Sequence, residues 1–296
     1  MPQSGPALPP FGLRLGLNVT AAGVRLLGRR RYRLSDALGN AAFALQPERR
    51  RVTIRNYRAA FPELDRREAR RLAARSFREY ARTSLDFLYT HHLPRTRVVS
   101  EMQTFGVEAN LDPLNLTGHG GILVTIHYGS WDVPGAFALA HRIDLTGVMA
   151  DEGNPTLANL VIWARAEIGF RVVLASRSPR TLLRTLRSGK WVALVADIPG
   201  ETPSVVVPFL GHLARFSTAP AALAARTGAP LVPATCVRRP GGGYLVEVHP
   251  PVWIEPGTDP ATALGQIIPV FEAAVRRWPE QWYPFNRDRF IDLPAL

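Results

Sequence analysis

The periodicity of the apolar residues changes at about residue 115, and this change limits the possible folds more than any other feature of the chain. Beyond it, short apolar and β-branched runs alternate with stretches of helical period. Strands whose apolar residues are continuous are buried on both faces, as in a parallel sheet covered by helices. The sequence therefore predicts an α/β fold with a mixed, largely parallel sheet flanked by helices. The expected strands are Gly121–His127, Leu145–Ala150, Phe170–Leu174, Trp191–Asp197, Val205–Phe209, Leu231–Val237 and Tyr244–Val248, and the expected helices are Val133–Arg142, Asn154–Ile168, Pro179–Arg187, Thr218–Thr227 and Pro260–Trp278.

Residues 1–100 show a helical pattern and no strand-like run. The longest expected helix extends to Thr90 and has Asp65 as its N-cap. Its apolar residues recur every three to five positions on one face, while arginines fill nearly all of the other face. We expect a basic helical N-terminal region over residues 1–100, which docks on a membrane, and an α/β core over residues 101–296 that forms one continuous domain.

The formal net charge of +12 is confined to the first third of the chain. Residues 1–100 contain 20 arginines and 7 acidic residues, whereas residues 101–296 contain 16 basic and 17 acidic residues. Such asymmetry predicts a polyanionic partner, which is either an anionic membrane surface or nucleic acid. A solvated arginine-rich face without a partner has the same composition, so this interpretation stays open.

The segment Phe11–Leu27 is apolar, but it contains Arg14 and Arg25 and leads into three arginines at 29–31. It is therefore too charged to span a bilayer. It also lacks the cationic start and small-residue cleavage site of a secretory signal. The segment either lies in the lipid headgroup region or packs on the protein body as an amphipathic helix.

The first expected strand leads into the sequence HYGSWD, residues 127–132. Reactive groups of open α/β sheets cluster beyond the carboxyl ends of the strands. There His127 can act as a general base if an acceptor holds one ring nitrogen, and Asp132 is a candidate for that acceptor. Gly129 would let backbone amides approach a developing oxyanion. A histidine that only packs in the core or caps a helix is the alternative.

The string GILVTIHYGSWDVPG resembles the signature block of the lysophospholipid acyltransferase superfamily, in which histidine precedes an acid by five positions. It is most similar to the branch that contains the lipid A biosynthesis acyltransferases and the phosphatidylinositol mannoside acyltransferases. Further matching blocks follow in order: RNYRAAFPEL (55–64), Asn159–Gly169, GKWVALVAD (189–197), VPFLG (207–211), PAALAARTGAPLVPA (220–234) and RWPEQWYPFNRDRF (277–290).

This resemblance implies transfer of a fatty acyl group from a thioester to a hydroxyl of a membrane glycolipid or (lyso)phospholipid. His127 would take the hydroxyl proton and Asp132 would orient the imidazole, while amides near Gly129 would stabilise the oxyanion. Arg165 matches a family arginine that could hold phosphate or the acyl donor. Asp197 ends another strand at a place where the family often has an acid.

The remaining site candidates are Ser130, which replaces the common asparagine, and Glu201, which lies in the loop after Asp197. The resemblance implies no cofactor, because acyl-CoA or acyl carrier protein is the donor substrate. The lipid A enzymes usually have a spanning N-terminal helix, and this sequence shows none, so we expect a peripheral, monotopic enzyme on the cytoplasmic face of the bacterial plasma membrane, with no nucleic acid partner.

Other classes of site find less support in the sequence. The single cysteine, Cys236, excludes an intramolecular disulfide and a cysteine-based metal site. There is no Gly-x-Ser-x-Gly nucleophile elbow and no complete P-loop. The non-enzymatic alternative is a protein that binds an anionic surface or nucleic acid through residues 1–100, and no DNA- or RNA-binding motif accompanies that region.

Overall fold

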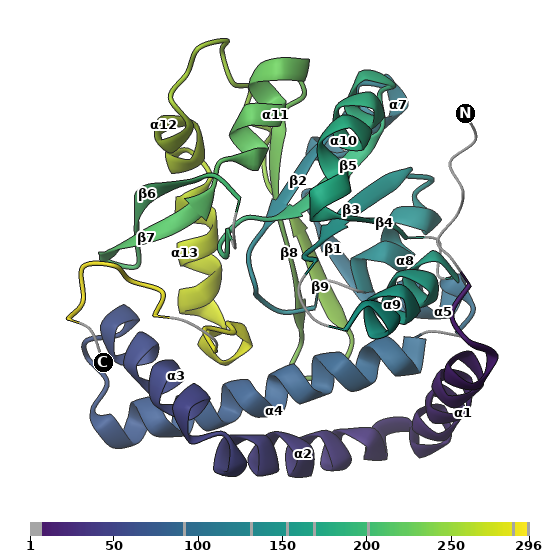
Figure 1. Cartoon of the computed structure of the whole chain (residues 1–296), viewed down its shortest axis with the longest axis vertical. Helices are drawn as coiled ribbons and strands as arrows, with labels where there is room; N and C mark the ends of the chain where they lie inside the picture. Colours follow the sequence, from purple (N-terminus) through teal and green to yellow (C-terminus); the bar gives the residue numbers. More distant parts are fainter. Residues whose placement is uncertain are drawn as a thin grey trace.

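A seven-stranded sheet forms the centre of the computed structural model, which describes residues 8–90, 93–130, 133–151, 154–167, 170–199, 202–285 and 288–294 (Figure 1). The strand order is β1-β9-β8-β2-β5-β3-β4. Strands β8, β2, β5, β3 and β4 are mutually parallel, whereas β9 is antiparallel to β8 and parallel to β1. The mixed, largely parallel sheet predicted from the sequence is thus confirmed. Its strands are β1 (Met102–Phe105), β2 (Gly121–Thr125), β3 (Leu145–Met149), β4 (Arg171–Leu174), β5 (Trp191–Val195), β8 (Leu231–Arg238) and β9 (Tyr244–Val248).

The structure differs from the expected elements in several places. Strand β1 was not expected, because three of its four residues are exposed and it has no apolar run. The segment expected as a strand at Val205–Phe209 is β6 (Ser204–Phe209), which pairs only with the unexpected β7 (His212–Ser217) in a separate hairpin. The final helix is divided into α12 (Pro260–Gly265) and α13 (Ile268–Arg277), since Pro269 lies in the first turn of the second helix and has no N–H to donate.

Helices cover both faces of the sheet and create two hydrophobic clusters. One cluster packs α12 and α13 with α10 (Ser178–Arg187) and α11 (Ala219–Thr227). The other cluster includes residues of α5 (Arg95–Ser100), α6 (Val107–Asn110), α7 (Asp112–Leu116), α8 (Val133–Ala140) and α9 (Pro155–Glu167).

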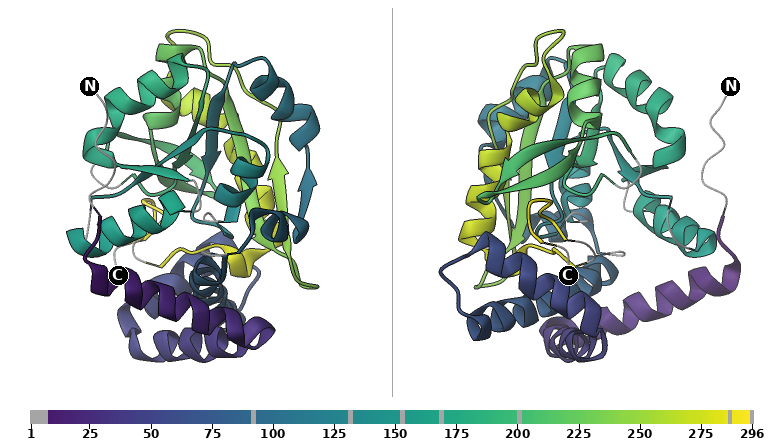
Figure 2. Two further views of the ribbon diagram at one scale, coloured as in Figure 1. Left: turned by 90° about the vertical axis from the view of Figure 1, so that its right-hand side faces the viewer. Right: turned by 60° about the vertical axis from the view of Figure 1, so that its left-hand side comes forward.

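The N-terminal helices form a layer at one end of the α/β core (Figures 1 and 2). They are α1 (Phe11–Leu27), α2 (Arg31–Leu45), α3 (Pro47–Ala60) and α4 (Arg66–Thr90). Asp65 and Glu68 cap α4 reciprocally, each side chain accepting the other residue's backbone N–H, as the predicted N-cap requires. Tyr57 and Phe77 belong to the same hydrophobic cluster as Ile122 of β2, so the layer shares the core of the α/β part.

Helix α2 lies on the outer side of α4, farther from the sheet (Figure 1). The contact is close because Gly39 faces α4 directly: a Cβ at this position would lie 2.5 Å from the Cα of Arg78. In the described residues, no helix is both long enough and apolar enough to cross a membrane.

Candidate active site

His127 and Asp197 meet at the carboxyl edge of the sheet. Each residue follows its strand by two positions, and the last residues of the two strands, Thr125 and Val195, are paired neighbours. The Nδ1 atom of His127 lies 2.7 Å from Oδ1 of Asp197, and the His127 backbone N–H donates to the same oxygen at 2.9 Å. The parallel register therefore brings together two residues that are 70 positions apart in the sequence.

Asp197 is buried and is held from its other side by Arg289, whose Nη2 donates to Oδ2 at 2.6 Å. Burial alone would raise the pKa of Asp197, but the charge of Arg289 and the contacts with His127 lower it to about 2. The carboxylate is thus negatively charged at neutral pH, and it can both orient His127 and stabilise a protonated imidazole.

Arg289 is a site residue that the sequence reasoning missed. The backbone N–H of Arg289 donates to Oδ1 of Asn56 in α3, and the Asn56 amide donates to the carbonyl of Pro284. Arg289 falls within one of the matching blocks, residues 277–290, but no local pattern connects it with Asp197. Only the return of the C-terminal segment past α3 places this arginine behind the carboxylate.

The structure places the other sequence candidates as follows. Asp132, the expected partner of His127, and Glu201 lie outside the described residues, and the place on Nδ1 is taken by Asp197. Gly129 and Ser130 follow His127 in the same loop, and Ser130 and Arg165 line one cavity. Among the predicted site residues that the structure describes, His127 and Asp197 form a direct side-chain contact.

Gly129 makes the tight turn that directs this loop. Its φ is +64°, and a Cβ at this position would lie 2.0 Å from the carbonyl oxygen of Cys236. The Gly129 N–H donates to the carbonyl of Gln281 at 2.8 Å, and the Ser130 N–H donates to that of Cys236 at 2.7 Å. Both amides are therefore already bound within the protein, and the expected oxyanion role of backbone amides near Gly129 finds no support in their geometry.

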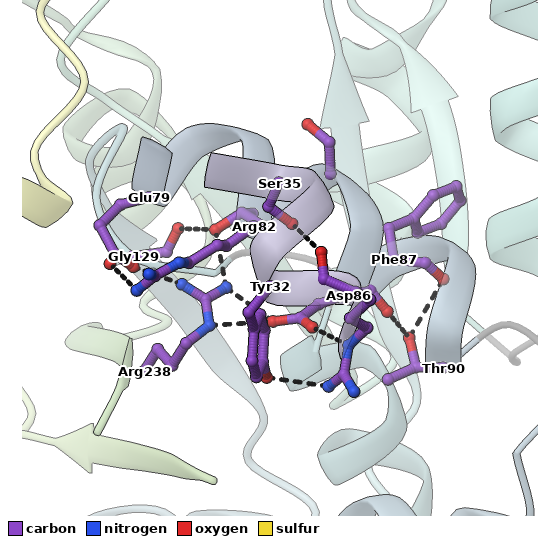
Figure 3. A network of polar contacts seen from close by, with 12 residues as sticks. Tyr32, Ser35, Glu79, Arg82, Asp86, Phe87, Thr90, Gly129 and Arg238 are labelled. Atoms are coloured by element: carbon purple, nitrogen blue, oxygen red, sulfur yellow. Dashed lines mark hydrogen bonds and ion pairs between the residues drawn. The ribbon is translucent and has the colours of Figure 1, made fainter. Parts of the chain in front are cut away.

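A buried polar network connects this loop with the N-terminal helices (Figure 3). Arg238, the last residue of β8, donates to Asp86 at 2.6 Å and to Glu79 at 2.6 Å, both in α4. Thr83, from the same helix, donates to the carbonyl of Gly129 at 3.3 Å. Arg31 of α2 donates to the second oxygen of Asp86 at 3.0 Å.

The side chain of Gln281 extends this network to the C-terminal segment. The side-chain amide of Gln281 exchanges two hydrogen bonds with the backbone of Arg238, while the backbone carbonyl of Gln281 accepts the Gly129 N–H. The backbone N–H of Tyr283 also donates to the carbonyl of His127 at 3.0 Å. Helix α4, the end of β8 and the C-terminal segment thus hold the loop that carries His127.

A cavity of about 110 Å³ lies on the α8 side of the sheet. Its wall is mainly apolar and includes Phe137, Leu145, Val172 and Val246. The hydroxyl of Ser130 is buried at this wall and has no hydrogen-bond partner among the described residues. A buried unpaired hydroxyl costs free energy, so it marks a place where a ligand could supply the missing partner.

Phe170 limits the cavity between two glycines. A Cβ at Gly147 would lie 2.5 Å from the ring of Phe170, and a Cβ at Gly135 would lie 3.0 Å from the Cβ of Phe170. These glycines leave the space that the aromatic ring fills. The size of the cavity therefore depends on this side chain.

This arrangement defines a class of protein. A histidine held by a buried carboxylate, at the carboxyl edge of an α/β sheet and close to an apolar cavity, is typical of an enzyme that removes a proton from a nucleophile. In the described residues, no group of three or more His, Cys, Asp or Glu side chains is arranged to hold a metal ion.

Comparison with known proteins gives the particular family. Residues 11–290 match the bacterial lipid A biosynthesis acyltransferases, and the chain belongs to this family. It is 27% identical over 267 residues to the lipid A biosynthesis lauroyltransferase of Escherichia coli K12, covering 89% of this chain and 86% of that one. It is 28% identical over 188 residues to the phosphatidylinositol mannoside acyltransferase of Mycobacterium tuberculosis CDC 1551, covering 62% and 59% of the two chains. The chain is therefore an acyltransferase, as the sequence blocks predicted.

Proposed function

We propose that this acyltransferase moves a fatty acyl chain from an acyl thioester to a hydroxyl of a membrane glycolipid or (lyso)phospholipid, with His127 as the general base. The observation that carries the proposal is the 2.7 Å contact between His127 Nδ1 and the buried, arginine-paired Asp197. The names of the two relatives, a lipid A lauroyltransferase and a phosphatidylinositol mannoside acyltransferase, favour a glycolipid acceptor.

The reaction follows from the orientation of the imidazole. With its Nδ1–H donated to Asp197, His127 takes the acceptor hydroxyl proton at Nε2 while the hydroxyl oxygen attacks the thioester carbonyl carbon. The tetrahedral intermediate collapses with cleavage of the carbon–sulfur bond. The leaving thiolate then takes the proton from the imidazolium, so the products are an ester and a free thiol. Asp197 stabilises the positive charge on His127 between the two proton transfers.

The cavity and its polar groups have separate roles in this proposal. The apolar wall accommodates part of the acyl chain, and the Ser130 hydroxyl donates to the thioester carbonyl as negative charge develops on it. Arg165, at the same cavity, holds a phosphate of the donor or the acceptor. Asp132 and Glu201 remain predicted site residues, and either acyl-CoA or acyl carrier protein serves as the donor.

We place the enzyme on the cytoplasmic face of the bacterial plasma membrane, attached from one side. Both thioester donors are made in the cytoplasm, whereas the acceptor lipid is embedded in the bilayer. The N-terminal helices, with their excess of arginine, supply the contact with anionic lipid.

Thiol release from palmitoyl-CoA in the presence of a glycolipid acceptor, followed by mass spectrometry of the product lipid, tests the proposal. His127→Ala should lower the rate at least about a hundredfold, because general base catalysis contributes about 10² to 10⁴. His212→Ala is the matched control, since His212 also contacts a carboxylate, Asp292, at 3.0 Å but outside this site. An active His127→Ala enzyme would show that another group removes the proton.

A further inference from the structure

We propose that the outward faces of α1 and α2 form one surface that inserts into the headgroup region of an anionic bilayer, with both helices parallel to the membrane plane. This surface, called here the α1–α2 face, comprises the exposed apolar residues Phe11, Leu15, Val19, Leu26, Leu34, Leu38 and Leu45. The inference deepens the proposed function, on whose lipid acceptor it rests.

Helix α1 presents its apolar side to the exterior. Phe11, Leu15, Val19 and Leu26 are spaced by four, four and seven residues, which places them on one side of a helix. They are 71%, 50%, 63% and 90% exposed. The buried residues of the same helix are the small Ala21 and Val24. A helix that faced water would bury the larger apolar side chains instead.

Helix α2 likewise buries polar residues and exposes apolar ones. Its buried residues, Arg31, Ser35, Gly39 and Phe43, include a charged and a polar side chain, whereas Leu34, Leu38 and Leu45 are exposed. Of the sixteen large apolar side chains that are exposed in the described residues, nine lie between Leu8 and Leu45. Such a concentration marks a surface that contacts something other than water.

The charges beside this face fit an anionic headgroup layer. Residues 8–35 contain six arginines and no acidic residue. Arg25, Arg29, Arg30 and Arg33 are exposed near the junction of the two helices. Arg31 is different: it is 4% exposed and bound to Asp86, so it is not part of the basic surface.

A bilayer fits these observations better than a protein or nucleic acid does. Nucleic acid would pair with the arginines but leave the leucines in water. In a twofold dimer through this face, residues 8–35 of each copy would bring six arginines and no acid to the interface. A membrane takes up both kinds of group, since apolar residues enter the acyl boundary while arginines bind phosphate.

The position of the face connects it with the chemistry. Helix α4 lies between α2 and the core (Figure 1). Its residue Thr83 donates a hydrogen bond to the loop that carries His127. The carboxyl edge of the sheet therefore lies at the same end of the molecule as the N-terminal layer. Docking through the α1–α2 face brings this edge toward the membrane that holds the acceptor lipid.

Flotation of the full-length protein with vesicles of phosphatidylcholine alone, or mixed with phosphatidylglycerol, tests the surface. Leu15→Asp and Leu38→Asp should each weaken binding to the mixed vesicles roughly tenfold or more, the effect of keeping one leucine out of an apolar phase. Leu116→Asp is the control, because Leu116 is 86% exposed on α7, outside the face. If Leu116→Asp weakens binding equally, or the wild type does not float, the proposal is wrong.

Charge reversal distinguishes a role of the arginines at this face from an effect of the net charge of the protein. Arg25→Glu/Arg29→Glu/Arg30→Glu should abolish most of the binding, in a manner that depends on salt. Arg180→Glu/Arg184→Glu/Arg187→Glu on α10 changes the net charge equally and should bind like the wild type. Equal losses in the two triple variants, binding to duplex DNA in preference to vesicles, or conversion of a wild-type dimer to a monomer by Leu38→Asp would each overturn the proposal.

Site-specific labelling shows whether the face inserts. Cys236, the single native cysteine, is buried, and burial raises the pKa of its thiol to about 12, so it reacts poorly. A polarity-sensitive fluorophore on Leu15→Cys should shift to the blue with mixed vesicles, and one on Leu116→Cys should not. His127→Ala should float like the wild type. A wild type that floats without transferring acyl groups contradicts the proposed function alone, whereas active enzyme without a shift at position 15 contradicts insertion alone.

Discussion

Two histidine–aspartate pairs in the described residues have similar geometry but different surroundings. The Nδ1 to Oδ distance is 2.7 Å for His127 and Asp197 and 3.0 Å for His212 and Asp292. Asp197 is buried and bound to Arg289, whereas Asp292 is partly exposed and pairs with none of the described arginines. A short contact alone therefore does not define a catalytic pair. Burial and a second charged partner fix the carboxylate and exclude the water that would weaken its effect on histidine.

The largest expected difference between the pairs is in catalysis. Asp197→Asn should lower kcat about 10³-fold or more, because the neutral amide neither stabilises the imidazolium nor maintains the same tautomer of His127. It should also lower the free energy of unfolding by about 3 to 5 kcal/mol, since Arg289 is left buried without its carboxylate.

Asp292→Asn is the matched change at the second pair and should leave kcat within about twofold, because that pair is exposed and outside the site. Steady-state kinetics and urea unfolding of both variants measure the contrast. Similar losses of activity would mean that the environment of Asp197 confers no special role on it.

The backbone beside each histidine offers a second test. Gly129 and Gly211 both have positive φ, at +64° and +84°, but a Cβ at Gly129 would collide with the Cys236 carbonyl, whereas nothing lies within 4 Å at Gly211. Gly129→Ala should lower the free energy of unfolding by about 3 kcal/mol, as strain and steric overlap combine, and it should displace His127.

Gly211→Ala should cost only about 1 kcal/mol, the strain of its positive φ alone. Thermal unfolding and thiol release, measured on both variants, give the comparison. If Gly129→Ala were as stable as Gly211→Ala, the loop would not be held as tightly as its contacts with β8 indicate.

Local periodicity was enough to predict most of the sheet and its parallel character. The runs that became β2, β5 and β8 are continuously apolar because helices cover both faces of the sheet. Strand β1 could not be found in this way, since it lies at the edge of the sheet and exposes three of its four residues. Edge strands need few apolar residues, so their sequences carry little periodic signal.

The site was only partly predictable, for a different physical reason. His127 and Asp197 each follow an apolar strand, so both were recognisable as candidates, but their contact depends on β2 and β5 being adjacent. Sequence proximity suggested Asp132 as the acceptor, and this residue lies outside the described ones. Arg289 requires the C-terminal segment to cross α3, a long-range contact that no local spacing encodes.

The smallest expected effect concerns Arg289 and is seen in the pH dependence. Burial raises the pKa of Asp197 and Arg289 is the strongest of the interactions that lower it, so Arg289→Gln should move this pKa upward from about 2. A depressed pKa stabilises the folded state above the unfolded value of 3.8, and this contribution is lost as the pH falls toward 2. In Arg289→Gln this contribution should be smaller and its loss complete at a higher pH, and kcat/KM should fall at a correspondingly higher pH on the acid side. At neutral pH we expect kcat/KM to fall about tenfold, because the carboxylate is still charged but less well positioned.

Arg289→Lys should restore most of the acid limb by keeping the charge, whereas a purely structural role would leave the pH profile of both variants parallel to that of the wild type.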